Sequence, residues 1–195
     1  GILPYVIILV VLAGLVGIEP HLSGAILVLG VGAVMMLVGG IHWGWVGGAI
    51  AAAGGLLYFV VFVLDYNRSR FEYWLNPWAD AQGSGYQLSQ SLLTIGSGGL
   101  LGVGLGKSRQ KFLYLPEEHN DFIFAIVCEE LGLIGATVIM LLFAALILRG
   151  FWIALHARDR FGSLMVVGVV TLVGLQTFLN IGVVTGLLPT TGISL

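Results

Sequence analysis

Charged residues are scarce in this chain of 195 residues: they make up 9% of it, whereas hydrophobic residues make up 58%. A soluble domain carries about 25% charged residues, so the composition excludes an ordinary soluble globule. It also excludes a disordered chain, which needs low hydrophobicity and high charge. The class that remains is a protein that crosses a membrane several times. Because the sequence starts and stops inside apolar runs, we expect it to be a piece of a longer protein.

Cysteine is nearly absent as well. Cys128 is the only one, which excludes a disulfide framework and a zinc cluster. His21 and His42 are isolated in the sequence, and we interpret all three residues as packing or interfacial, so no metal site is predicted. The formal net charge of −2 gives no indication of nucleic-acid binding.

The positions of the few charges predict the membrane spans. No charged residue lies between Glu19 and Asp65. A single helix formed by residues 20–64 would be roughly 67 Å long, which is more than twice the hydrocarbon thickness of a bilayer, so this stretch must turn. The glycines and aromatics of residues 39–45 suit a turn at the membrane–water interface. The predicted spans are Leu3–Ile18, Leu22–Val38, 45–64, 122–148 and 164–188.

These spans predict an all-α, polytopic transmembrane bundle in three parts. Residues 1–64 form helices one to three, residues 65–121 form a large loop that holds most of the charges, and residues 122–195 form helices four and five. Three arginines in the connection 149–160 place it in the cytoplasm by the positive-inside rule, so the loop lies on the outer side. Arg68 and Arg70 favour the opposite orientation, but long loops follow the rule poorly.

The large loop contains a helical pattern followed by glycines. Polar residues recur at Gln87, Gln90, Ser91 and Thr94 opposite an apolar stripe, which predicts an amphipathic helix over residues 87–95. It could lie in the membrane interface or pack on the bundle. The glycines at 98, 102 and 106 predict either closely packed helices or a tight, partly re-entrant turn. A phosphate loop is excluded, because Leu101 stands where that motif requires glycine.

Two clusters of ionisable residues complete the loop. Three cations recur at alternate positions, so in an extended segment they would lie on the same side. They form either a solvated cluster that faces the lipid headgroups or a clamp that binds a phosphorylated headgroup. Three acids and a histidine then precede the fourth span. Helix capping accounts for at least one acid, and a carboxylate partly removed from water there can act as a general base. The clusters are Lys107, Arg109 and Lys111, and Glu117, Glu118, His119 and Asp121.

Polar residues also occur within the last two predicted spans. Glu129 and Glu130 could join the site, relay protons, or be protonated and hydrogen-bonded structurally, because intramembrane carboxylates usually face a cavity or a partner. Gln176 and Asn180 lie four residues apart, which predicts interhelical hydrogen bonds, with pocket lining as the second interpretation.

Several motifs occur in order along the chain. They are Asn76-Pro77-Trp78, residues 83–87, Gln90-Ser91, residues 95–111, residues 115–125, Glu129-Glu130-Leu131-Gly132 and residues 186–195. Together they resemble those of the SEDS proteins, the shape, elongation, division and sporulation family of FtsW, RodA and SpoVE. Residues 104–111 are more similar to the FtsW/SpoVE branch than to RodA. Glu19-Pro20-His21-Leu22 departs from the family's more usual Gln-Pro-Asp-Leu-Gly, so no chemistry is expected there.

The resemblance implies a fold, a location and an activity. Family members have about ten transmembrane helices in the bacterial cytoplasmic (inner) membrane, so this chain would hold about five, with the large loop extracytoplasmic. The family polymerises lipid II, an undecaprenyl-pyrophosphate disaccharide-pentapeptide, into glycan strands. Its essential aspartate falls on Asp121, the expected catalytic base. The residues expected to bind substrate are Lys107, Arg109, Lys111, Glu117, Glu118, His119 and Gln90, with Glu129, Glu130, Gln176 and Asn180 as intramembrane support.

The expected partners are a class B penicillin-binding protein and division or elongation proteins. No dedicated cofactor is expected, although a divalent cation such as Mg²⁺ or Mn²⁺ could accompany the pyrophosphate of the substrate. Two other functions stay open from the sequence: a lipid II flippase or transporter, and a non-catalytic scaffold of a division complex.

Overall fold

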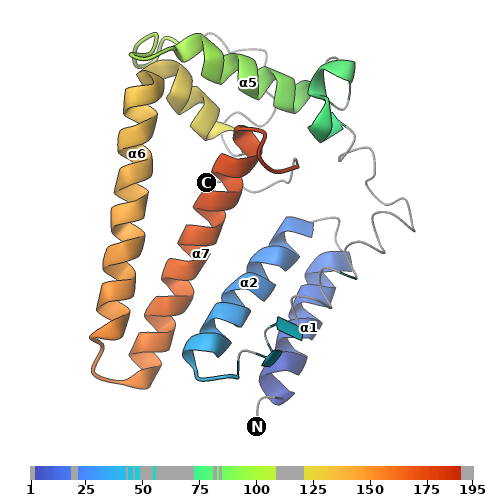
Figure 1. Ribbon diagram of the computed structural model, residues 1–195, viewed down its shortest axis with the longest axis vertical. Coiled ribbons are helices and arrows are strands. Elements are labelled where there is room, and N and C mark those ends of the chain that lie inside the picture. The colour runs from blue at the N-terminus through green and yellow to red at the C-terminus, as the bar shows by residue number, and fades with distance from the viewer. Residues whose placement is uncertain are drawn as a thin grey trace. The chain divides into compact units, whose positions relative to one another are not determined.

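The computed structural model of the chain describes residues 3–18, 22–42, 44–45, 47–48, 55, 73–80, 83, 85–108 and 121–189. Within these ranges the regular elements are helical. They are α1 (Leu3–Ile18), α2 (Leu22–Val38), the 3-10 helix η2 (Pro77–Asp80), α5 (Tyr86–Gly98), α6 (Ile123–Leu155) and α7 (Arg160–Val184) (Figure 1). By length and composition α6 and α7 can cross a membrane, and α1 and α2 are shorter apolar helices. The predicted fold class, an all-α membrane bundle, is confirmed.

The helix ends follow from local signals. The bounds of α1 and α2 coincide with the first two predicted spans. Helix α7 begins four residues before the predicted start, because Asp159 accepts a hydrogen bond from the amide of Gly162 at 2.6 Å and caps the first turn. It ends at a glycine cap, where Gly186 has a φ of 75° and Leu188 donates to the carbonyl of Gly182 at 2.9 Å. The predicted span 45–64 lies mostly outside the described residues.

The chain forms two compact units, and the first comprises Gly1–Arg68 and Ile147–Leu175. Small residues let its helices approach closely. A Cβ at Gly32 of α2 would overlap the side chain of Leu9 of α1. A Cβ at Gly30 would lie 2.7 Å from Leu175 Cδ1 of α7. Helix packing within the unit therefore depends on glycine at the crossing points, as is common between membrane helices.

The second unit comprises Ser69–Leu146 and Gln176–Leu195. Its core forms where the start of α6 meets the end of α7, and α5 packs against it. The core residues are Phe122, Phe124, Ala125, Cys128, Ala136 and Val184. All the described site residues predicted from the sequence belong to this unit.

Helix α6 is broken. Gly132 has a φ of 66° and a ψ of −173°, which separates a short N-terminal part from a long C-terminal part. We call residues 123–131 the arm. Figure 1 shows the arm in yellow, bending sharply away from the orange remainder of α6. Residues 133–155 would extend about 34 Å, which is the length needed to cross the hydrocarbon. The predicted unbroken span 122–148 was therefore wrong about the break and about the C-terminal end.

Candidate functional site

Asp121 lies in the turn that leads into the arm. Its main-chain carbonyl accepts a hydrogen bond of 2.8 Å from Nδ2 of Asn180 on α7. Asn180 is 1% exposed, and the next residue along the chain, Phe122, is buried in the core. The backbone of Asp121 is thus held between a buried amide and a buried ring, while the residue itself is only half-buried.

The C-terminal end of α7 is bound by side chains from the large loop. Ser91 of α5, which is fully buried, donates to the carbonyl of Val184 at 2.8 Å. The indole Nε1 of Trp74 donates to the carbonyl of Gly186 at 2.8 Å. The last carbonyls of a helix have no partner within it, so Ser91 supplies one for α7, and Trp74 binds the glycine cap that follows the helix.

The buried face of α5 is partly polar. Leu88, Ser91, Thr94 and Gly98 are buried and lie on one side of the helix, whereas Leu93 on another side is exposed. Of the two interpretations of this helix, packing on the bundle is the one that the structure supports. Ser91 and Thr94 are buried, and their hydroxyls donate to main-chain carbonyl oxygens.

The loop after α5 closes the break in α6. We call residues 99–106 the glycine loop. On one side of the break, the amides of Val103 and Gly104 donate to the carbonyls of Glu129 and Glu130, at 2.9 and 3.1 Å. On the other side, the amides of Leu133 and Ile134 donate to the carbonyls of Gly99 and Leu100, at 2.9 and 3.2 Å. The loop therefore satisfies main-chain groups that a break inside an apolar helix would otherwise leave unpaired.

This contact requires glycine on both partners. A Cβ at Gly98 would overlap the carbonyl oxygen of Cys128, and one at Gly102 would overlap that of Glu130. Gly102 and Gly132 also have positive φ values, of 78° and 66°. Both interpretations of the glycine segment hold in part. Gly98, the last residue of α5, lets that helix approach the arm closely, and Gly102 lies in a tight turn. Nothing lies within 4 Å of a Cβ built at Gly106.

The carboxylate of Glu129 accepts a hydrogen bond from the hydroxyl of Ser108, the residue that follows Lys107. Both side chains are 3% exposed. Glu130, the next residue, has one buried carboxylate oxygen, Oε1, with no hydrogen-bond partner in the described part of the chain. Lys107 itself is exposed. The first cation of the predicted cluster is thus adjacent to a buried contact with the arm.

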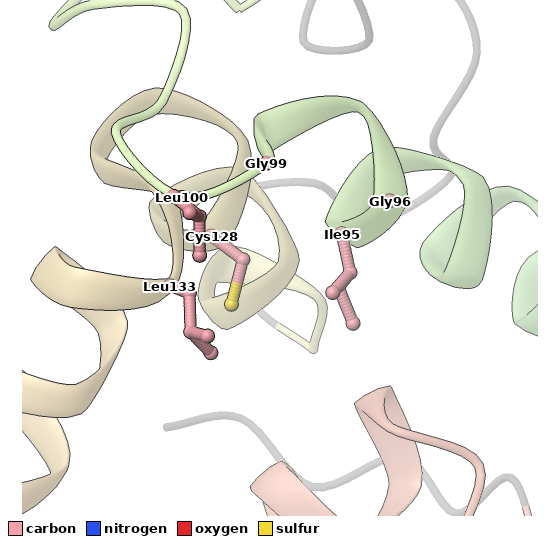
Figure 2. Close-up of a pocket in the computed structure, with 6 residues that line it drawn as sticks. All are labelled: Ile95, Gly96, Gly99, Leu100, Cys128 and Leu133. Carbon is pink, nitrogen blue, oxygen red and sulfur yellow. The ribbon is translucent and has the colours of Figure 1, made fainter.

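A pocket of about 330 Å³ lies between α5, the glycine loop and the break in α6. Figure 2 shows that Ile95, Cys128 and Leu133 direct their side chains to the same side of the loop. The lining is apolar and does not include Asp121. The residues that line it are Ile95, Gly96, Gly99, Leu100, Cys128 and Leu133.

The whole sequence matches one family of known proteins. The sequence model of the FtsW/RodA/SpoVE family, described as cell cycle protein, covers residues 1–195. The chain belongs to this family. The resemblance inferred from the motifs is therefore confirmed.

Two relatives within the FtsW/RodA/SpoVE family match most of the chain, and the name of the first describes an activity. A probable peptidoglycan glycosyltransferase FtsW of Geobacter metallireducens is 44% identical over 100% of this chain and 52% of that protein. Stage V sporulation protein E of Bacillus subtilis is 49% identical over 91% of this chain and 48% of that protein. The chain spans about half the length of the curated relatives it matches.

A solved structure has the same fold. It is described by the words "Structural coordination of polymerization and crosslinking by a peptidoglycan synthase complex". The TM-score is 0.78 at 27% sequence identity, and the match covers 98% of this chain and 53% of that one. The family and its apolar helices make this a bacterial membrane protein.

The structure brings together only part of the set of residues predicted for the family's chemistry. Asn180 was predicted to donate to another helix, and it donates a hydrogen bond from α7 to the backbone of Asp121 in the turn before the arm. Gln176 lies one turn away on α7 and is half-buried, as is Gln90 on α5. Glu129 and Glu130 lie on the arm, before the long segment that has the length of a membrane span. Arg109, Lys111, Glu117, Glu118 and His119 lie outside the described residues.

Three contact residues were missed by sequence reasoning. Ser108, Ser91 and Trp74 make the polar contacts that join the loop to the helices. No local pattern in the sequence identifies the distant carbonyl or carboxylate to which each of these side chains donates. A stronger signal existed for Gly132, because a glycine inside an apolar helix lowers helix stability and can indicate a break.

Proposed function

We propose that this chain is part of a peptidoglycan glycosyltransferase that polymerises lipid II outside the bacterial inner membrane, during division or sporulation. The names of the relatives support this proposal, since both FtsW and SpoVE match over more than nine tenths of the chain. The observation that carries it is the fixed position of Asp121, whose carbonyl is bound by the buried Asn180. A carboxylate on a backbone held in this way can meet a substrate hydroxyl with little reorganisation.

In the proposed reaction, Asp121 removes the proton from the 4-hydroxyl of the acceptor sugar. The freed oxygen attacks the anomeric carbon of the donor, with inversion, and the bond to undecaprenyl pyrophosphate breaks. Negative charge develops on the departing pyrophosphate, where a cation stabilises the transition state. Lys107 is exposed and is our candidate for this role, together with Arg109 and Lys111 from the sequence. A divalent cation carried by the substrate could share it.

The proposal extends to a partner. The solved structure with the same fold is described as belonging to a synthase complex that coordinates polymerisation with crosslinking. We propose that this protein likewise works with a class B penicillin-binding protein, which crosslinks the strands that it makes. Copurification of the two full-length proteins from membranes is the direct test, and their failure to associate would contradict this part of the proposal.

The test of the activity uses the purified full-length protein and lipid II. We expect glycan strands from the wild type, and we expect Asp121→Asn to abolish them while lipid II binding persists. Asp159→Asn is the control, because Asp159 is an exposed acid in the connection before α7. Normal polymerisation by Asp121→Asn would contradict the proposed mechanism. A wild type that moves lipid II across vesicles without polymerising it would indicate the transporter instead, and one that does neither would indicate the scaffold.

A further inference from the structure

The arm of α6 connects two parts of the chain that the proposed reaction uses, the turn with Asp121 and the segment with Lys107. The arm follows Asp121 directly at one end, and near its other end Glu129 and Glu130 contact the glycine loop and Ser108. Lys107 is the neighbour of Ser108 in the sequence. From Asp121 to Glu129 the backbone rises about 12 Å at the helical value.

The arm is held at both ends. Asn180 binds the carbonyl of Asp121 at the first end, and at the second the amides of Val103 and Gly104 bind the last carbonyls of the arm. These main-chain bonds hold the glycine loop, but they end at Gly104, three residues before Lys107. The amide of Lys107 donates to the carbonyl of Gly104 at 3.1 Å, and the side-chain contact between Ser108 and Glu129 extends the connection to the arm past Lys107.

Glu129 is suited to this contact by its place in the fold. The carboxylate is almost fully buried, and a buried carboxylate is costly unless it is hydrogen-bonded. Ser108 is equally buried, so the bond between them excludes water and constrains both backbones. An exposed contact would not restrict the backbone beside Lys107 in the same way.

We propose that Glu129 is a positioning residue, which through Ser108 fixes the backbone beside Lys107 at a set distance along the arm from Asp121. The inference rests on the proposed function, in which Asp121 is the base and Lys107 faces the leaving pyrophosphate. The arm then sets the distance between Asp121, which activates the acceptor hydroxyl, and Lys107, which stabilises the negative charge on the departing pyrophosphate. Glu129 acts without touching substrate.

The test measures KM and kcat for lipid II with the full-length protein carrying Ser108→Ala, Glu129→Ala or both. We expect each single variant to raise KM about tenfold, the effect of losing one buried hydrogen bond, with a smaller change in kcat. The double variant should be no worse than either single one, because both remove the same contact. Glu129→Gln should stay close to wild type, since its amide oxygen can accept the same bond.

Cys128→Ala is the matched control, because Cys128 is buried on the same arm and its side chain contacts neither Ser108 nor Lys107 in the described contacts. A purely structural role would lower the yield of folded protein but leave KM unchanged. If Glu129→Ala fails to fold, Ser108→Ala removes the same bond with a smaller change. An unchanged KM, additive effects, or a Gln variant as impaired as the Ala variant would overturn the inference. Polymerisation by Asp121→Asn would instead overturn the proposed function.

Discussion

Asn180 and Asp121 lie 59 residues apart in the sequence and are joined by a hydrogen bond of 2.8 Å from the amide Nδ2 to a main-chain carbonyl. The bond engages the backbone of Asp121 and not its carboxyl group. It therefore fixes where the residue lies without itself occupying the group proposed to act as the base. A polar residue deep in an apolar helix is costly, and this contact gives Asn180 a structural reason to be there.

The first prediction concerns this bond. Asn180→Ala removes the donor from this part-buried hydrogen bond, which should lower stability by about 1 kcal/mol. Because the turn that carries Asp121 loses its anchor, kcat for polymerisation should fall as well. Thermal unfolding and lipid II polymerisation by the full-length protein in detergent measure the two effects.

Phe178→Ala provides the control for Asn180, since Phe178 lies two residues away on α7 and is 67% exposed. It should leave both quantities near their wild-type values. An Asn180→Ala protein with normal stability and normal kcat would show that the bond does not position Asp121.

The second prediction compares two serines of α5. Ser91→Ala removes the bond to Val184 at the end of α7, and we expect a loss of about 1 kcal/mol. Ser97→Ala removes only a bond to Thr94 within the same helix, on an exposed side chain, and should be nearly neutral. The difference between their melting temperatures is the measurement. Equal effects would mean that α5 does not stabilise the end of α7.

Much of the fold could be predicted because its signals are local. Helices α1 and α2 end where expected, since a charge with a proline separates them and glycines with aromatics follow. Asn180 could be assigned a hydrogen bond because amides in apolar helices need partners. That this bond reaches the main chain of a turn, at Asp121, could not be predicted, because the two residues are far apart in the sequence and meet only in the folded protein.

The break in α6 could not be predicted for a related reason. A glycine inside an apolar helix can indicate a break, but Gly168 and Gly174 lie within α7 without breaking it, so the presence of Gly132 does not by itself predict one. A φ of 66° at Gly132 is tolerated there because the glycine loop, about thirty residues earlier, supplies partners for the freed main-chain groups. Glu129 was expected inside a straight span and lies instead on the arm, so its contact with Ser108 could not be inferred from spacing.

The third prediction tests the close contact between α5 and the arm. Gly96 and Gly98 both lie on α5, but only at Gly98 would a Cβ meet backbone, at Cys128. Gly98→Ala should destabilise the protein by about 1–3 kcal/mol through overpacking. Gly96→Ala should be neutral or stabilising by up to about 1 kcal/mol, because alanine favours helix. Melting temperatures that rank the two variants in the opposite order would contradict the packing described.

The last prediction tests the break itself. Gly132→Ala places a Cβ against the glycine loop at a residue whose φ is positive, so it is opposed by both overlap and backbone strain. The positive φ alone costs roughly 1–2 kcal/mol, and the overlap with Gly102 adds to it. We therefore expect a larger fall in melting temperature than for Gly98→Ala, together with loss of polymerisation as the arm loses its attachment. Gly174→Ala is the control, since the added Cβ on α7 would meet Ile147 only at an ordinary 3.6 Å. If Gly132→Ala were as stable as Gly174→Ala, α6 could run unbroken through this position, and the spacing between Asp121 and Lys107 would not depend on the glycine loop.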